Sequence, residues 1–369
     1  MTDLIDSLVP LTVQQSTYAA RHERAKVVDA TQSSYEAIFA PSVQGISVVE
    51  RLHAAHRACE LAHADALTAH YARRLLEEGS ALSKAAGLPA SDARLQAILQ
   101  FSATLTERPL DGDKAALEAL TQVGLSTPAI VALAQLIAFV SYQIRLVAGL
   151  SAMAMAEPGG SDALATAQRL NALDPRVTPK GFTSDVVGWR AWLPTVALQD
   201  ASAEQIAALE AMSPTAKQSA YFLSLVHQSE ILLQRSIAFN AIMFAPGGLP
   251  RAERELGATV ESRINGCIYC ASVHAQRFEQ LAKRRDVIDQ VFAAPLSAGT
   301  TARERTIVQF SAALTLSPHA MRAEQILPLQ AVGLSPLEIL DLMHAVALFA
   351  WANRLMLNLG EPVAPATAS

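Results

Sequence analysis

ELGATVESRINGCIYCASVH, residues 255–274, is the stretch from which the fold and the chemistry of this chain can be predicted. Its second half contains the dipeptide Asn265-Gly266, which favours a turn and interrupts a helical pattern. Cys267 follows directly, so we expect it in the first turn of a new helix. The stretch therefore predicts two consecutive helices joined by a tight turn, with a cysteine at the junction.

Two thiols and an imidazole share one face of the second predicted helix. Cys267, Cys270 and His274 are separated by three, four and seven residues, and such positions are neighbours at 3.6 residues per turn. A thiol in the first turn faces the partial positive charge of unpaired backbone N–H groups, which favours the thiolate. His274 can serve as its base or proton relay, and Glu255, one helix earlier, can orient that imidazole. The pattern predicts a redox-active dithiol.

The composition is typical of a compact helical protein with a large buried surface. Of 369 residues, 51% are apolar and 17% are charged, and aromatic residues are few. Alternating β-branched runs are absent, so no strand is expected. The formal charge of −5 and the lack of a Lys/Arg-rich run give no basic surface for nucleic acid. The predicted fold class is all-α, with no nucleic-acid partner.

We expect the chain to be cytoplasmic, with no membrane partner. The N-terminal MTDLIDSLVP lacks a basic region followed by an apolar core, which is the pattern of a secretory signal. Residues 129–140 and 339–350 are strongly apolar, but both stretches are shorter than a membrane span of about 20 residues. Buried core helices are the better interpretation. Three cysteines are too few for a disulfide framework, and a CxxC pair in this compartment is typical of redox or metal chemistry.

An internal repeat relates the two halves of the chain. RLQAILQFSATLTERP at residues 94–109 recurs as RERTIVQFSAALTLSP at residues 303–318, which is 209 positions later. Arg145 recurs as Arg354 at the same interval, near the ends of the two apolar stretches. Ion-pair or helix-end contacts are expected for this pair of arginines.

The repeat predicts two helical domains joined by a connecting segment: residues 1–155, residues 235–369 and, between them, residues 156–234. A shift of 204 positions places four first-half residues opposite Glu255, Cys267, Cys270 and His274, namely Arg51, His63, Ala66 and His70. No thiol stands at these positions. The first domain is therefore expected to lack the chemistry of the second.

The spacing E-x₁₁-C-x-x-C-x-x-x-H in an Ala- and Leu-rich chain resembles the alkylhydroperoxidase D (AhpD)-like superfamily, which includes the carboxymuconolactone decarboxylase-like proteins. The stretch LPRAERELGATVESRINGCIYCASVHAQRF, residues 249–278, is similar to the peroxidase-related branch in particular. The similarity extends over residues 189–362 and reaches the first half only through the repeat. The resemblance implies two tandem AhpD-like helical domains and a homo-oligomer, as a trimer or dimer of this chain.

The resemblance also implies a reaction and a role for each residue. Cys270 is similar to the peroxidatic thiol, Cys267 to the resolving thiol, and His274 with Glu255 to the proton relay. The implied activity is reduction of a hydroperoxide by an external dithiol or dithiol protein, without cofactor or metal. The residue between the cysteines is histidine in the better-studied member and Tyr269 here. Reduction of the disulfide by exchange requires an accessible sulfur, and we expect that sulfur to be the one of Cys267.

Two other hypotheses use the same residues. The CxxC pair could exchange disulfides with a protein partner. Alternatively, Cys267, Cys270 and His274 could be three zinc ligands in a non-catalytic redox or zinc-dependent assembly protein, although the second half has no further motif to supply a fourth ligand. A true lactone decarboxylase is disfavoured, because that chemistry has no need of a vicinal thiol pair.

Further histidines and a lone cysteine in the first half have no role that the sequence assigns. His53, His56, His63 and His70 form a cluster in which seven-residue spacing places rings roughly 10 Å apart. This is too far to share one ion without other ligands. We expect core or interface histidines, and Cys59 as a small buried apolar residue.

Overall fold

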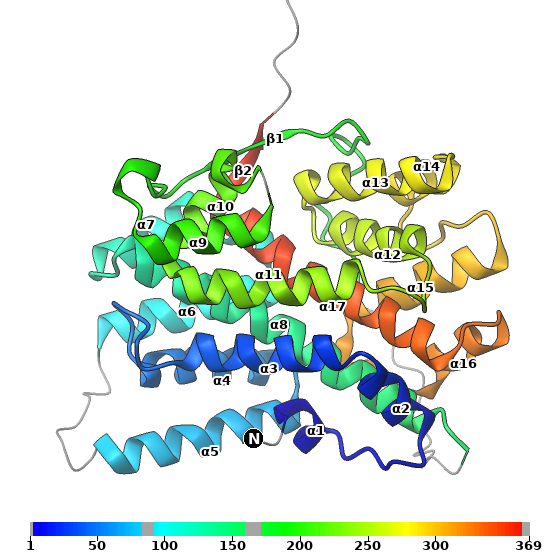
Figure 1. The fold of residues 1–369 in the computed structure, drawn as a ribbon, viewed down its shortest axis with the longest axis horizontal. Coiled ribbons are helices and arrows are strands. Elements are labelled where there is room, and N and C mark those ends of the chain that lie inside the picture. The colour runs from blue at the N-terminus through cyan, green and yellow to red at the C-terminus, as the bar shows by residue number, and fades with distance from the viewer. Residues whose placement is uncertain (1–2, 83–91, 159–170, 214, 364–369) are drawn as a thin grey trace, which may run out of the picture.

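The computed structural model describes residues 3–82, 92–158, 171–213 and 215–363. These segments are predominantly helical, as predicted, and they pack around a continuous hydrophobic core (Figure 1). The helices of the first half are α1 (Leu4–Leu8), α2 (Ser16–Glu23), α3 (Ala25–Phe39), α4 (Val48–Leu61), α5 (Asp65–Leu82), α6 (Ala93–Glu107), α7 (Lys114–Gln122) and α8 (Thr127–Met155).

The rest of the chain begins with a short strand and small helices and continues into a second set of long helices. The connecting elements are β1 (Gly188–Ala191), α9 (Ala203–Met212) and α10 (Ala220–Leu225). They are followed by α11 (Ser229–Met243), α12 (Arg251–Ile264), α13 (Ile268–Ala282), α14 (Asp286–Ala293), α15 (Ala302–Leu316), α16 (Ala323–Ala331), α17 (Pro336–Asn358) and β2 (Gly360–Val363). Short 3₁₀ turns link several of these elements, at Pro109–Asp111, Leu198–Asp200, Ala216–Gln218, Val226–Gln228 and Pro318–Ala320.

The two most apolar helices, α8 and α17, pack against each other in the centre of the molecule. Both are long and apolar enough to cross a membrane by composition, yet 94% and 100% of their most apolar windows are buried inside the protein. Their placement confirms the prediction of core helices. Gly149 permits the close approach, because a Cβ there would lie 2.0 Å from Sδ of Met343.

The helices of the two halves follow the same order. Three helices of the first half have counterparts that begin 209 positions later: α6, α7 and α8 correspond to α15, α16 and α17. A reciprocal contact also relates the halves. Nη2 of Arg145 donates to the main-chain oxygen of Thr315 at 2.8 Å, and Nη2 of Arg354 donates to that of Thr106 at 3.2 Å. These bonds confirm the predicted helix-end contacts of both arginines. The two halves share one core, and their division into domains stays a prediction.

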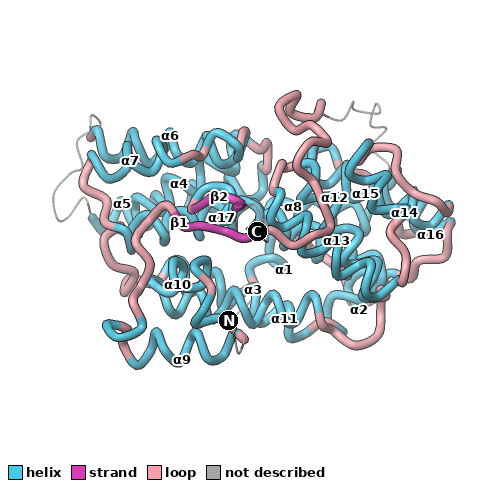
Figure 2. The backbone as a smooth tube through the Cα atoms, turned by 90° about the horizontal axis from the view of Figure 1, so that it is seen from above, coloured by secondary structure: helices cyan, strands magenta, loops and turns pink. Residues whose placement is uncertain are grey.

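Two short strands contradict the prediction that the chain has none. β1 pairs antiparallel with β2, with Gly188 opposite Val363 and Ala191 opposite Gly360 (Figure 2). Strands of this length are too short for an alternating pattern to be recognised in the sequence. Gly360 is required here, since a Cβ would lie 2.3 Å from the ring of Trp189.

A buried carboxylate fixes the start of α12 against α17. Oδ2 of Asp341 accepts 2.8 Å bonds from both Arg24 and Arg254, and a 3.0 Å bond from the main-chain N–H of Leu249. Arg254 also donates to main-chain oxygens of the loop between α11 and α12, including that of Ala245 at 2.9 Å. A buried charge with this many partners is well compensated. The network holds α12, which carries Glu255, in a defined position.

Candidate functional site

The two cysteines meet at the start of α13. Asn265 ends α12 and Gly266 adopts a left-handed conformation with φ of 80°, which confirms the predicted turn. Cys267 is the N-cap residue of α13 and Cys270 lies in its first turn. Their sulfur atoms are 2.8 Å apart, and both are free thiols. The pair is thus within reach of a disulfide without rearrangement of the main chain.

Both sulfurs lie inside the protein, so the expectation that Cys267 is exposed is wrong. The exposed fraction is 1% for Cys267 and 4% for Cys270. The reason is that the turn before α13 packs against the first half and the connecting segment: a Cβ on Gly266 would lie 2.9 Å from Leu110 and 3.1 Å from Val177. Position near a helix start does not imply exposure when that start abuts another part of the fold.

Glu255 and His274 form a buried acid–base pair between α12 and α13. Nδ1 of His274 lies 2.5 Å from Oε2 of Glu255, and Nε of Arg251 donates to Oε1 of the same carboxylate at 2.6 Å. Burial raises the pKa of Glu255, but the neighbouring His274 and Arg251 outweigh it and hold that pKa below its usual range. The ring of Phe349 stands edge-on to His274 at 4.2 Å between centroids. Nδ1 is thereby engaged, whereas Nε2 has no hydrogen-bond partner among the described residues.

Ionisation of Cys270 is unfavourable in the buried dithiol. Burial raises the pKa of Cys270 well above its ordinary value, the hydrogen bond and charge of Cys267 raise it further, and Arg235 opposes them. The two sulfurs are so close that a negative charge near Cys267 disfavours a negative charge on Cys270. A reacting thiolate at this position requires a compensating positive charge.

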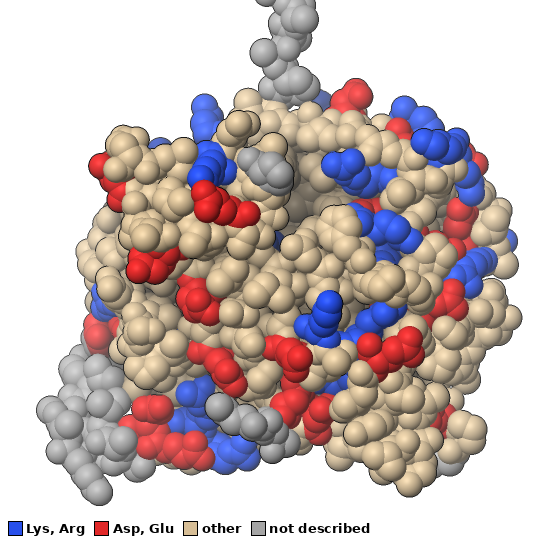
Figure 3. All heavy atoms as spheres, in the orientation of Figure 1, with Lys and Arg blue, Asp and Glu red and all other residues tan. Residues whose placement is uncertain are grey.

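Three residues that form one cluster were not predicted from the sequence, and two of them, Arg235 and Tyr221, lie within electrostatic range of the dithiol. Arg235 on α11 is 4% exposed, and its guanidinium carbon lies 5.6 Å from the ring centre of Tyr221 and 5.7 Å from that of Trp351. Its Nε and the hydroxyl of Tyr221 are buried without a hydrogen-bond partner. The molecular surface is hollowed between α10 and the start of α13 (Figure 3). In the sequence, Arg235 is distinguished only as the one cation within the mostly apolar residues 229–243.

The first half carries an apolar core where the second half carries its reactive groups. Helices α4 and α12, and likewise α5 and α13, begin 203 positions apart, so the predicted shift of 204 is wrong by one residue. The left-handed residues His63 and Gly266 show the same shift of 203. Counterparts of Glu255, Cys267, Cys270 and His274 are therefore Leu52, Ala64, Leu67 and Tyr71. Leu52, Leu67 and Tyr71 are fully buried.

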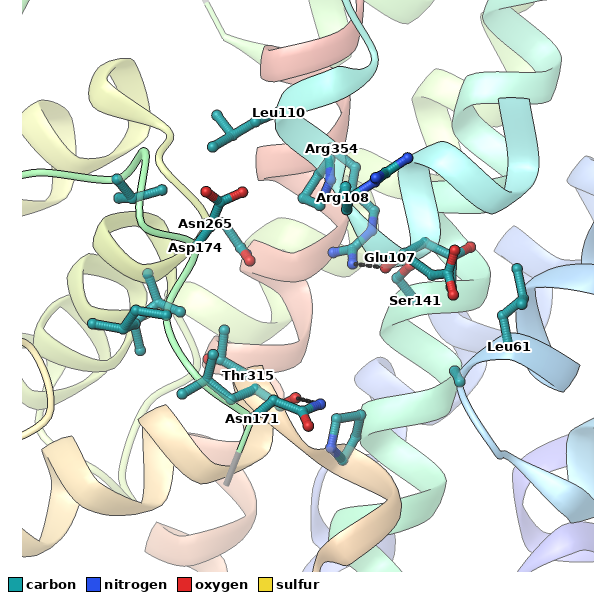
Figure 4. Close-up of a pocket in the computed structure, with 18 of the residues that line it drawn as sticks. Leu61, Glu107, Arg108, Leu110, Ser141, Asn171, Asp174, Asn265, Thr315 and Arg354 are labelled. Carbon is teal, nitrogen blue, oxygen red and sulfur yellow. Dashed lines mark hydrogen bonds between the residues drawn. The ribbon is translucent and has the colours of Figure 1, made fainter. Parts of the chain in front are cut away.

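A separate large cavity opens between the two halves. Its volume is about 880 Å³, and four arginines line it, namely Arg108, Arg145, Arg176 and Arg354. Figure 4 labels Arg108 and Arg354 in the wall of this cavity. Ile264 and Asn265, at the end of α12, belong to its wall, but neither cysteine lines it. The cavity therefore reaches the residues that precede the dithiol turn, but the two sulfurs do not line it.

Of the four histidines of the first-half cluster, His70 is buried as expected, His53 and His56 are half-buried, and His63 is exposed, so the expectation of a core position is wrong for His63. Nε2 of His70 lies 2.8 Å from the hydroxyl of Tyr35, and His63 stacks edge-on against His319 at 5.4 Å. Cys59 is fully buried, as expected. Within the part of the chain that the structure describes, no three His, Cys, Asp or Glu side chains are arranged to hold a metal ion.

One comparison with known proteins finds a match, and the match covers the segment that carries the site. The model of the carboxymuconolactone decarboxylase family matches residues 232–313, which include Glu255, both cysteines and His274. The match covers α11 to most of α15 and leaves the first half outside. No curated protein matches the chain. The segment is similar to this family, and the repeat and the peroxidase-related branch stay predictions.

Proposed function

We propose that this chain is a thiol-dependent hydroperoxide reductase in which Cys270 attacks the peroxide and Cys267 resolves the product. The observation that carries this proposal is the 2.8 Å separation of the two sulfurs beside a buried Glu255–His274 pair. Such a dithiol can be oxidised and reduced reversibly, and the adjacent imidazole can move a proton. The family match over the same residues supports an alkylhydroperoxidase-like role.

The proposed reaction has four steps. The thiolate of Cys270 attacks one peroxide oxygen, so that an S–O bond forms, the O–O bond breaks and an alkoxide leaves. The alkoxide takes a proton from His274 and departs as an alcohol. The thiol of Cys267 then attacks the sulfenic sulfur, which forms the disulfide and releases water. An external dithiol reduces the disulfide by exchange and is itself oxidised.

Glu255 prepares His274 for the proton transfer. An ionised carboxylate bound to Nδ1 fixes one tautomer and the orientation of the imidazole. Nε2 then remains the nitrogen that can exchange a proton with the reacting oxygen. Arg251 holds the second carboxylate oxygen and keeps the acid ionised.

The burial of both sulfurs restricts the reductant. A dithiol on a narrow, flexible carrier can enter a hollow that a flat protein surface cannot, so we propose a small dithiol or a dithiol-bearing arm as the electron donor. The same burial disfavours general disulfide exchange with folded proteins. The zinc hypothesis gains no support from the arrangement of the described side chains. A cytoplasmic location and a homo-oligomeric state complete the proposal.

The test is steady-state consumption of hydrogen peroxide and of an organic hydroperoxide with dihydrolipoamide as electron donor. The wild-type chain should consume peroxide, and Cys270→Ser and Cys267→Ser should lose turnover. One equivalent of peroxide should also remove two titratable thiols per chain from the reduced protein. Cys59→Ser is the matched control and should behave as the wild type. Peroxide consumption that survives in Cys270→Ser, or an unchanged thiol count, would reject the proposal.

A further inference from the structure

We propose that Arg235, held between Tyr221 and Trp351, is the positive charge that balances ionised Cys270 and so sets the pH range in which the dithiol reacts. This inference rests on the proposed function only in requiring that the dithiol reacts as a thiolate. It concerns a residue on α11 that neither the cysteine motif nor its spacing identifies.

Arg235 differs from the other buried arginines of the described chain in having no polar partner. The others donate to carboxylates or to main-chain oxygens: Arg21, Arg24, Arg51, Arg145, Arg254, Arg263 and Arg354. Within the described residues, Arg235 forms no ion pair and its Nε has no hydrogen-bond partner. Its surroundings are aromatic faces, which attract a cation but leave its charge uncompensated. Only Nε of the guanidinium is fully buried without a partner, so the charge can persist without an ion pair and is available to stabilise an anion nearby.

The dithiol is the source of that anion. Arg235 lowers the pKa of Cys270 against the effects of burial and of Cys267. Burial raises the pKa of Tyr221, Arg235 lowers it, and both cysteines raise it, so the four groups lie within electrostatic range of one another. Tyr269 is a further titratable neighbour, and burial followed by the two cysteines raises its pKa. The Glu255–His274 pair also faces the dithiol, because His274 lies one helical turn after Cys270 on α13. Among the groups that act on Cys270, Arg235 is thus the one positive charge identified in the described residues.

The first half offers an internal comparison without thiols. Helices α3 and α11 begin 204 positions apart, so Thr31 is the counterpart of Arg235. Helices α8 and α17 begin 209 positions apart, so Tyr142 is the counterpart of Trp351. Thr31 and Tyr142 form a neutral hydrogen bond of 2.9 Å between their hydroxyls. The cation is present in the half that carries the thiols and is replaced by a neutral pair in the half that does not.

The experiment measures the pH dependence of Cys270 alkylation by iodoacetamide in the reduced, full-length chain, followed by peptide mass spectrometry. Arg235→Met should move the midpoint upward by about one pH unit, which lowers the rate at neutral pH about tenfold. Arg235→Lys should restore most of that loss, because it retains the charge. Arg277→Met, which removes an exposed arginine from α13, is the matched control and should leave the midpoint unchanged.

Equal midpoints in Arg235→Met and the wild type would overturn the inference, as would an Arg235→Lys variant that behaves like Arg235→Met. Removal of an unpaired buried charge should not lower the melting temperature, whereas a structural arginine would. If Arg235→Met does not fold, Arg235→Gln is measured and judged by the same midpoint. Alkylation requires no peroxide, so this experiment is independent of the proposed function. If Arg235→Met shifts the midpoint but the wild-type chain consumes no peroxide, the proposed function is rejected and this inference is retained.

Discussion

Nδ1 of His274 lies 2.5 Å from Oε2 of Glu255, and this contact joins the two helices on either side of the dithiol turn. The carboxylate is completely buried, and its other oxygen is held by Arg251. A charge at such a site is stable only while its partners remain. The contact therefore links the protonation of the imidazole to the packing of α12 against α13.

Glu255→Gln should lower kcat/KM for peroxide about tenfold, and His274→Gln about 100-fold, because loss of the acid misorients the imidazole whereas loss of the imidazole removes the proton donor. The double variant should be no slower than His274→Gln, since both residues act through one proton. Steady-state assays across peroxide concentrations test this. Glu60→Gln on the exposed face of α4 is the control. Strictly additive losses in the double variant would contradict a shared role.

The stability of the fold should decline as the pH falls below about 6.5, because His344 is buried in its neutral form. Burial, together with Arg21, Arg24 and Arg254, lowers the pKa of His344 from 6.5 to about 3. The unfolded chain then binds a proton that the folded chain excludes, so the stabilisation present above pH 6.5 is lost as the pH falls toward 3. A shift of this size corresponds to a few kcal/mol.

His344→Gln removes the titration and retains a group that can bond the hydroxyl of Tyr142, which lies 3.2 Å from Nδ1 of His344. The free energy of unfolding in urea, measured between pH 7 and pH 4, should depend less on pH in this variant than in the wild type. Parallel pH profiles for the two proteins would show that His344 does not govern acid stability. His22→Gln, at an exposed site, serves as control.

The sequence predicts local geometry well and mutual placement poorly. The turn at Asn265-Gly266 and the adjacent start of α13 follow from residue types that punctuate helices. The burial of Cys267 does not follow from residue types. It depends on Leu110 from the first half, and a short motif contains no information about such long-range packing. Arg235 was missed for the same reason: its significance lies in what surrounds it, and its neighbours come from α10, α13 and α17.

The one-residue error in relating the two halves has a physical cause. Histidine spacing in the first half suggested an alignment with His274, whereas the helices align by their caps and by the left-handed residue between them. Backbone conformation at His63 and Gly266 is the better guide, since a positive φ restricts the turn more strongly than any side chain beside it. Tyr71 then occupies the position of His274 and fills it with an aromatic core residue.

Substitutions at the two left-handed positions should have unequal effects. Gly266→Ala places a Cβ at φ of 80° and 2.9 Å from Leu110, so it should destabilise the fold by about 1–3 kcal/mol and disturb the dithiol turn. His63→Gly at φ of 52° relieves the same strain in the first half and should change stability by less than about 1 kcal/mol. Urea denaturation measures both. Equal destabilisation by the two variants would show that the turns are not equivalent.

Removal of the resolving thiol should trap the first oxidation product. In Cys267→Ser, one equivalent of peroxide added without an external dithiol should leave a sulfenic acid on Cys270, because the sulfur that lies 2.8 Å away in the wild type is gone and Cys59 is buried elsewhere in the first half. Dimedone labelling with peptide mass spectrometry should locate the adduct on Cys270 in this variant and find almost none in the wild type, where the disulfide forms first. Cys270→Ser should give no adduct. Labelling of Cys267 in Cys270→Ser, with none on Cys270 in Cys267→Ser, would reverse the two roles.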